Sequence, residues 1–367
     1  MSAPTASHGV GKTCSSLVGG MARAGARVTL HTPRYDGPPL PGVAISTPFG
    51  GLVGRLPHRL IRRYSVPRLH RDFYQALEEG DIAYLWPSVP IGVYRSVHGL
   101  GVPIVMEAIN TLMKDALPIL DAAYDSLGLP HGHNITQARI DDEIERIALA
   151  SAILSPSPDT DRSLATIAGD DRIVRTSYAT SLADVRPRTP RRPDAPVTFL
   201  FLGRDVVRKG LHHLLEAWRV PPPGARLRVI GIEPSPMLRL YDDVLSRPDV
   251  FVSGFTRDPL AEYARSDVFV LPSLEEGDPL VTYDAAAAGI PILASAAGAG
   301  RIGADGSVVR IMDTTNVEAL RDELHALAAS RELREDWGAR ARRAVADYDW
   351  MSVAARRAEA LATLLNR

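Results

Sequence analysis

Two loops in the second half of the sequence place charged side chains at the ends of short apolar runs. The first run, Val197–Leu202, is followed by Gly203-Arg204 and then Lys209-Gly210, just before a helical pattern at Leu211–Trp218. Ligands of open α/β sheets bind at the carboxyl ends of strands, where a helix N-terminus adds backbone donors for an anion. Arg204 could donate to two phosphate oxygens while Lys209 adds a compact charge, so the pair suits a diphosphate. An ordinary solvated loop is the alternative interpretation.

The second loop follows the apolar run Val268–Leu271 and carries carboxylates. Glu276 and Asp284 lie eight residues apart, on either side of Pro279. If Pro279 opens a helix, the first turn presents free backbone N–H groups and Asp284 lies one turn further on. A nucleotide sugar needs acceptors for its hydroxyls beside donors for its phosphates, and this segment offers both. Alternatively, the acidic residues simply complement the helix dipole.

Short apolar runs alternate with helix-length segments along the whole chain, which is typical of parallel sheets with helices on both faces. The predicted strands are Val28–His31, Ile82–Leu85, Pro103–Met106, Ile153–Ser155, Val197–Leu202, Leu227–Ile232, Val250–Ser253, Val268–Leu271 and Ile290–Ala294. A length of 367 residues favours two domains. Ser181–Pro196 is rich in proline and arginine and is predicted to link them. We therefore expect an N-terminal domain over 1–185, a linker over 186–196, a second domain over 197–347 and a C-terminal helix within 348–367 that could pack back on the first domain.

The composition excludes several classes of protein. The net charge is −1, with 45% hydrophobic and 23% charged residues, which does not favour nucleic acid as a partner. The single cysteine, Cys14, excludes an internal disulfide and fits a reducing compartment. No apolar run is long enough to cross a bilayer and no secretion signal is visible, so we expect a cytoplasmic protein.

Three strings in the second half resemble the successive C-terminal motifs of a large family of retaining glycosyltransferases, the glycosyl transferases group 1. They are FLFLGRDVVRKGLHHLLEAW, FVSGFTRDPLAEYARSDVFVLPS and EEGDPLVTYDAAAAGIPILAS. The resemblance implies a GT-B fold, with two Rossmann-like doubly wound parallel-sheet domains facing an interdomain cleft. It also implies transfer of a hexose from a UDP- or GDP-sugar to the hydroxyl of a glycan, a lipid-linked acceptor or a small molecule, with no metal or other cofactor.

The same resemblance assigns roles to individual residues. Arg204 and Lys209 would bind the donor diphosphate and act as catalytic electrophiles, Glu276 would contact the transferred sugar, and Asp284 would hold the ribose hydroxyls. The remaining implied donor-binding residues are Gly203, Phe255, Thr256, Gly277, Asp278, Pro279, Leu280 and Val281. Two positions depart from the family: Asp284 stands in place of a glutamate, and Asp278 stands in place of an aromatic or apolar residue of the sugar pocket.

The N-terminal segment His8-Gly9-Val10-Gly11-Lys12-Thr13 resembles a phosphate-binding P-loop only in part. Ala6 stands where that pattern needs glycine and no strand precedes it, so a P-loop nucleotidase is a weak alternative. In the resembled family a glycine-rich loop follows the first strand here and faces the cleft, which makes His8, Gly9, Gly11 and Lys12 acceptor-side candidates. That first strand is expected to be missing or very short in this sequence, which suggests a late start.

Other candidates lie in the first half. Glu107 and Asn110 follow a predicted strand and are acceptor-side candidates, with helix-cap or loop roles as the alternative. His131 and His133 are expected to be loop residues rather than metal ligands. The basic segment 55–71 could contact anionic lipid headgroups, steer an anionic acceptor or form a plain charged surface.

Two further functions stay open at this stage. A phosphorylase-like relative would use inorganic phosphate as the acceptor, and a non-catalytic protein would bind the sugar nucleotide without transferring the sugar. The preferred interpretation is a glycosyltransferase of glycan, polysaccharide or glycolipid biosynthesis.

Overall fold

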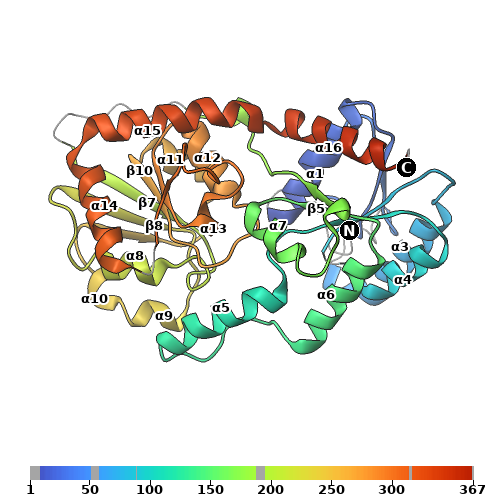
Figure 1. The fold of residues 1–367 in the computed structure, drawn as a ribbon, viewed down its shortest axis with the longest axis horizontal. Helices are drawn as coiled ribbons and strands as arrows, with labels where there is room; N and C mark the ends of the chain where they lie inside the picture. The colour runs from blue at the N-terminus through green and yellow to red at the C-terminus, as the bar shows by residue number, and fades with distance from the viewer. Residues whose placement is uncertain (1–8, 51–57, 88, 187–194, 314–315, 366–367) are drawn as a thin grey trace.

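The computed structural model describes residues 9–50, 58–87, 89–186, 195–313 and 316–365. Two α/β domains lie side by side along the long axis of the molecule (Figure 1). Among the described residues, no helix is long and apolar enough to span a membrane. All strand pairings within the three sheets are parallel, so the predicted fold class is confirmed.

The described strands of the first domain form two separate sheets. Strands β1 (Val28–His31) and β2 (Val43–Ser46) form one, and β3 (Ala83–Leu85), β4 (Ile104–Glu107), β5 (Ala152–Ser155) and β6 (Ile173–Arg175) form the other in that order. Strands β4 and β5 are buried along their whole length, as expected for apolar runs covered on both faces. The helices are α1 (Gly9–Arg23), α3 (His58–Gln75), α4 (Ile91–Gly99), α5 (Met113–Ser126), α6 (Gln137–Leu149) and α7 (Pro158–Leu164).

The second domain is built on one six-stranded sheet with the order β12-β11-β10-β7-β8-β9. Its strands are β7 (Val197–Leu202), β8 (Ala225–Ile230), β9 (Val250–Ser253), β10 (Val268–Leu271), β11 (Ile292–Ala294) and β12 (Arg310–Ile311). The chain moves outward from β7 through β8 to β9 and then returns to the other side of β7 at β10. The gap between the carboxyl ends of β7 and β10 is therefore the topological switch point, where sheets of this kind bind ligands.

Helices cover this sheet and reach across to the first domain. They are α8 (Leu211–Ala217), α9 (Pro236–Arg239), α10 (Asp242–Leu245), α11 (Pro259–Ala264), α12 (Leu280–Ala288), α13 (Ala296–Ala299), α14 (Val317–Ala329), α15 (Arg331–Ala344) and α16 (Trp350–Leu365). Short 3-10 helices lie at Asp170–Arg172, Leu182–Asp184 and Val345–Tyr348. Helices α15 and α16 follow one another along one side of both domains (Figure 1).

The C-terminal helix α16 packs on α1 of the first domain. A methyl group added to Gly20 would lie 2.4 Å from the side chain of Ala354, so the two helices touch closely. Arg357 of α16 enters the first domain and donates to both carboxylate oxygens of Glu107, at 3.0 and 2.8 Å. This corrects the expectation that Glu107 lines a cleft: its side chain is fully buried as the partner of Arg357.

The nine predicted strands match nine observed ones within two residues at either end. Strands β2, β6 and β12 were not predicted. They have four, three and two residues. The predicted linker includes 187–194, which lie outside the described residues.

Candidate functional site

The loops that follow β7 and β10 meet at the switch point. Lys209 donates to Glu276 at 2.5 Å, and the hydroxyl of Ser273 donates to the same oxygen at 3.0 Å. Arg208 donates to the other oxygen of Glu276 at 3.2 Å. Gly210 allows this approach, since it has a φ of +66° and a side chain there would lie 1.9 Å from the Pro272 carbonyl. The fold thus brings a lysine, an arginine and a carboxylate into one cluster.

Charge pairing keeps Glu276 ionised in a buried position. Burial by itself would raise the pKa of this carboxyl, but the positive charges of Lys209 and Arg208 outweigh burial, and the pKa is lowered. Lys209 is also mostly enclosed, with 13% of its side chain exposed. The Glu276 carboxylate is therefore charged at neutral pH in a largely dry site, where electrostatic interactions are stronger than in water.

Glu275 connects this cluster to the first domain. It accepts hydrogen bonds from the hydroxyl and the backbone N–H of Thr111, at 2.7 and 3.2 Å. Burial raises the pKa of Glu275, although Arg208 and Thr111 oppose the rise. The sequence analysis missed Arg208, Glu275 and Thr111. A signal for Arg208 existed, because it stands beside Lys209 in the same cationic loop, but only the tertiary contact shows that it faces the carboxylates.

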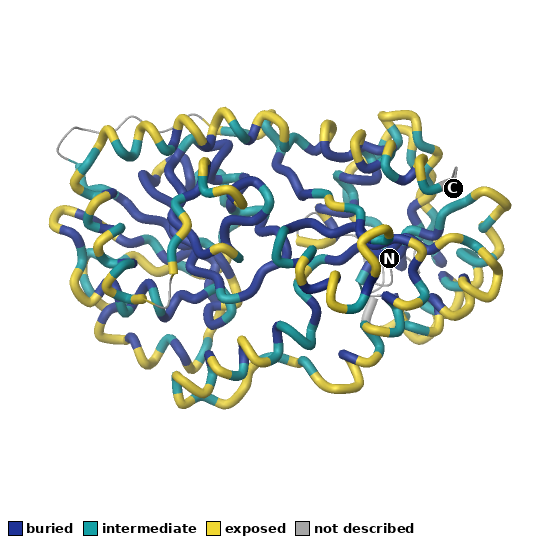
Figure 2. Tube along the Cα trace, viewed as in Figure 1, coloured by how far each residue is buried: buried dark blue, intermediate teal, exposed yellow. Residues whose placement is uncertain are grey.

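The backbones of the two domains touch directly beside this cluster. A side chain added to Gly277 would lie 1.7 Å from the carbonyl oxygen of Ile109. Asn110, an acceptor-side candidate, is exposed between Ile109 and Thr111. The loop after β4 in the first domain therefore faces the loop after β10 in the second, and Figure 2 shows buried chain running between the two halves.

Arg204 and Asp284 do not join the cluster of Lys209 and Glu276. The exposed side chain of Arg204 pairs with Glu233. Asp284 accepts a hydrogen bond from the hydroxyl of Thr180 at 2.6 Å. Burial raises the pKa of Asp284, while this hydrogen bond and the positive charge of Lys12 oppose the rise. Lys12 of the first domain thus lies near the second carboxylate of the predicted pair.

Asp278 is buried and fully engaged by the protein. It accepts hydrogen bonds from the backbone N–H of Tyr178 at 2.6 Å, the hydroxyl of Tyr283 at 2.6 Å and the backbone N–H of Arg301 at 2.8 Å. Burial raises its pKa to about 6 despite these bonds. Arg301 in turn donates to Asp161 of the first domain at 2.8 Å. Asp278 therefore ties the connecting segment to the second domain.

The other predicted residues are distributed around these contacts. Gly203 is buried beneath the Lys209 side chain. Phe255 is 67% exposed in the loop after the edge strand β9, with Thr256 next to it. Pro279 caps α12 as predicted, so Leu280 and Val281 occupy its first turn. Gly9, Gly11 and Lys12 belong to α1 rather than to a loop, which corrects the expected glycine-rich loop, and His8 lies outside the described residues.

One group of metal-ligating side chains comes together in the described part of the chain. Asp121 of α5 lies 2.9 Å from His131 and 2.6 Å from His133. The backbone N–H of Ile135 approaches Nδ1 of His133 at 3.3 Å, which leaves Nε2 to carry the proton and donate to Asp121. Both histidines lie in the irregular segment between α5 and α6 and hydrogen-bond to aspartates of α5.

Comparison with known proteins identifies the second domain. Residues 185–344 match the family model for glycosyl transferases group 1. The MMP alpha-(1->4)-mannosyltransferase of Mycolicibacterium hassiacum is 37% identical over 160 residues, which are 41% of this chain and 39% of the relative. The chain therefore spans about two fifths of the length of that curated relative.

Solved structures extend the likeness of the fold to the first domain. Sucrose-phosphate synthase from Thermosynechococcus elongatus superimposes with a TM-score of 0.72 at 18% identity, covering 99% of this chain and 95% of the other. The Anabaena HepE protein in complex with UDP and glucose gives a TM-score of 0.69 at 13% identity, covering 98% and 97%. The fold is thus the GT-B arrangement of two Rossmann-like domains. Residues 185–344, which carry the motifs at 199–218, 251–273 and 275–295, are similar to the glycosyl transferases group 1 family.

Proposed function

We propose that this chain is a retaining, metal-independent glycosyltransferase that moves a hexose from a UDP- or GDP-sugar to a hydroxyl acceptor. The observation that carries the proposal is the enclosed cluster of Lys209, Arg208 and Glu276 at the switch point of the second domain, with the first-domain loop around Asn110 beside it. This arrangement offers cations to a diphosphate and a carboxylate to sugar hydroxyls at one position.

The donor is proposed to bind with its diphosphate near Lys209. Arg204 is the second residue after β7, and its side chain would leave the exposed ion pair with Glu233 to bind phosphate oxygens. Such an exposed pair contributes little free energy, so its loss would cost little on binding. Asp284 would hold the ribose hydroxyls, and Phe255 would frame the base. The HepE structure holds UDP and glucose in a protein of the same fold, which supports a nucleotide-sugar donor.

The proposed reaction forms a bond between the acceptor oxygen and the anomeric carbon on the face from which the nucleotide leaves. The bond from that carbon to the diphosphate oxygen breaks, and the acceptor's proton passes to the departing phosphate. Negative charge grows on the diphosphate as the bond breaks, so preorganised cations at Arg204 and Lys209 would lower the barrier. Since two cations can supply the charge of a divalent metal, we propose that no metal is required.

The acceptor is proposed to enter from the first domain near Lys12 and Asn110. A role in glycan, polysaccharide or glycolipid synthesis in the cytoplasm follows from this proposal. Peripheral membrane contact through 55–71 is part of it. Within that segment α3 exposes Leu60 and Tyr64, at 63% and 57%, next to the exposed Arg62 and Arg63. Residues 55–57 lie outside the described residues.

A panel of UDP-, GDP- and ADP-sugars tests the proposal, with Lys209→Met as the decisive variant. Loss of this charge should lower turnover by roughly a hundredfold or more, as for other preorganised transition-state donors. Arg204→Ala should have an effect of the same order. Arg219→Ala is the matched control, because Arg219 forms surface pairs with Glu216 and Asp243. Near-normal turnover in both Lys209→Met and Arg204→Ala would refute the assignment.

A non-catalytic sugar-nucleotide-binding protein is a second candidate. The observation in its favour is that Asp278 and Asp284 are both held by hydrogen bonds within the protein. Tight binding of a nucleotide sugar without transfer or donor hydrolysis, across a broad acceptor set, would favour this candidate over the transferase.

A further inference from the structure

The connection between α5 and α6 carries three side chains of the kinds that bind transition metals. Asp121 of α5, His131 and His133 each offer one ligand atom, and these atoms all lie within 4.8 Å of one another. The carboxylate stands ten positions before His131 in the sequence, and helix α5 brings it next to both rings. The fold thus adds a carboxylate to two histidines that the sequence alone assigns to a plain loop.

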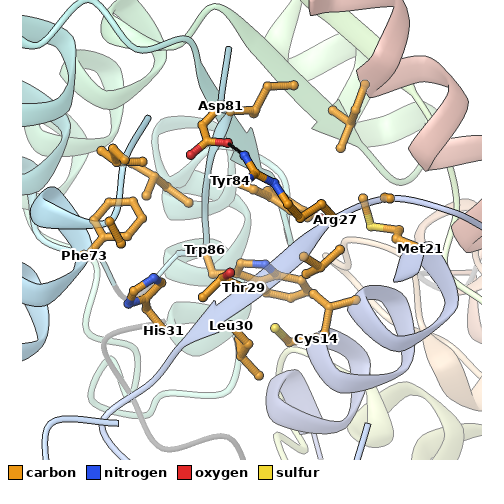
Figure 3. Close-up of a pocket in the computed structure, with 18 of the residues that line it drawn as sticks. Cys14, Met21, Arg27, Thr29, Leu30, His31, Phe73, Asp81, Tyr84 and Trp86 are labelled. Carbon is orange, nitrogen blue, oxygen red and sulfur yellow. Dashed lines mark hydrogen bonds and ion pairs between the residues drawn. The ribbon is translucent and has the colours of Figure 1, made fainter. Parts of the chain in front are cut away.

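Among the described residues, the large cavity of the first domain offers no comparable group. This cavity has a volume of about 580 Å³, and Cys14, His31 and Asp81 are among the side chains that line it. Figure 3 shows these three side chains on different walls, and Asp81 pairs with Arg27 at 2.9 Å. The α5–α6 connection is therefore the better place to look for a metal.

The three ligand atoms lie close to the positions that a tetrahedral metal site needs. Oδ1 of Asp121 lies 2.9 Å from Nδ1 of His131 and 2.6 Å from Nε2 of His133. Zinc binds histidine nitrogen and carboxylate oxygen at about 2.0–2.1 Å, so its tetrahedral ligand atoms lie about 3.3 Å from one another. Each contact must therefore lengthen by less than about 1 Å, which small rotations of the side chains can supply.

The other contacts of the two histidines are compatible with metal binding. Nε2 of His131 lies 2.9 Å from Oδ1 of Asp125, and a ligating histidine usually donates its second ring N–H to a carboxylate or another acceptor. His133 would bind through Nε2, which places its proton on Nδ1. The Ile135 N–H lies 3.3 Å from that nitrogen. This contact is longer than a typical hydrogen bond, so little is lost when the N–H turns aside.

The site lies on a segment that reaches the second domain. Tyr124 of α5 lies beside both histidines, with its ring centroid 6.1 Å from each of theirs. The preceding residue, Ala123, is buried in the same apolar cluster as Leu211 and Met237 of the second domain. A metal ion here would hold the histidine loop against α5 at the place where α5 meets the other domain.

We propose that Asp121, His131 and His133 bind one Zn²⁺-like transition-metal ion, with water as the fourth ligand. Imidazole suits Zn²⁺ and its neighbours, whereas Mg²⁺ and Ca²⁺ prefer oxygen ligands. The side chains of Asp121 and His131 are 33% and 40% exposed, which leaves the fourth position open to solvent. The ion has a structural role. None of its ligands belongs to the cluster of Lys209 and Glu276, so the inference is independent of the proposed transferase activity and of its need for metal.

Zinc titration of the full chain, purified without a histidine tag and treated with a chelator, tests the proposal. Calorimetry should show one Zn²⁺ bound per chain. A hundredfold excess over the dissociation constant should raise the melting temperature by roughly 5 °C or more, and Mg²⁺ at the same concentration should not. The X-ray absorption spectrum of the bound zinc should fit two imidazole nitrogens and two oxygens at about 2.0–2.2 Å.

Substitutions separate this site from adventitious binding at surface histidines. Asp121→Ala and His133→Gln should each abolish stoichiometric binding, while Asp125→Asn should weaken the affinity about 10- to 100-fold. His98→Gln is the matched control, because His98 is exposed on α4, and it should leave the affinity unchanged. Absence of stoichiometric binding, unchanged binding in His133→Gln, or a spectrum without imidazole would overturn the proposal. If a variant does not fold, the spectrum of the native chain decides.

Discussion

Replacing Arg357 with methionine should destabilise the first domain strongly. Arg357 and Glu107 have side-chain exposures of 1% and 0%. Arg357 also donates to the carbonyl of Ser177 at 2.9 Å and to Tyr84 at 3.2 Å. Removing one partner of such a buried pair leaves an uncompensated charge, which costs about 3–5 kcal/mol. For a domain of this size, that cost lowers the melting temperature by roughly 10 °C.

The assay is urea unfolding monitored by circular dichroism. The unfolding curve is fitted with two transitions, because the chain has two domains. Arg356→Met is the matched control. Arg356 is exposed on the same helix and donates only to the carbonyl of Asp347 among its described contacts, so its loss should cost less than about 1 kcal/mol. The double variant Glu107→Gln with Arg357→Met should recover about 2 kcal/mol or more, because no buried charge is left unpaired.

Two results would refute this reasoning. One is a loss of stability in Arg357→Met no larger than that in Arg356→Met. The other is a double variant no more stable than the single one, which would mean that Arg357 acts through packing rather than by neutralising Glu107.

Three other predictions concern the contact between the domains and the surface of α3. Gly277→Ala should separate the domains, because the new methyl group would collide with the Ile109 carbonyl. Small-angle X-ray scattering should then show a more open particle. An unchanged scattering profile would count against this contact between the domains. The pKa of Asp278 is about 6 in the folded state, whereas the pKa of an aspartate in the unfolded chain is about 4. The free energy of unfolding should therefore fall by about 3 kcal/mol as the pH rises from about 4 to about 6. The variant Asp278→Asn should not show this fall when its unfolding is measured over the same range. Charge reversal of Arg62 and Arg63 should weaken flotation with anionic vesicles by about tenfold or more at low salt; equal flotation of the reversed and native proteins would exclude membrane contact through α3.

The sequence was informative wherever the signal was local. Apolar runs of four or more residues, such as Val197–Leu202 and Val268–Leu271, located the central strands, because burial on both faces excludes polar residues from them. Pro279 predicted the start of α12, because its fixed φ suits a helix N-terminus. Cations after β7 and carboxylates after β10 were also visible, and parallel topology brings the carboxyl ends of these strands to one edge of the sheet.

The contacts between side chains could not be predicted from the sequence in this way. The sequence pointed to Arg204 as the arginine of this loop, yet it is Arg208 that turns toward Glu276, while Arg204 pairs with Glu233 on the surface. Glu107 resembled a site residue from its place after a strand, and its partner, Arg357, lies 250 positions away.

The order of apolar and polar residues was enough to determine two parallel α/β domains and the loops in which charge collects, because strand burial and helix periodicity act over a few neighbouring positions. The tertiary structure alone decided which carboxylates pair with Lys209 and Arg208 and which hold the domains together. Such features depend on distances between residues far apart in the chain, and those distances are set only when the sheets and helices pack.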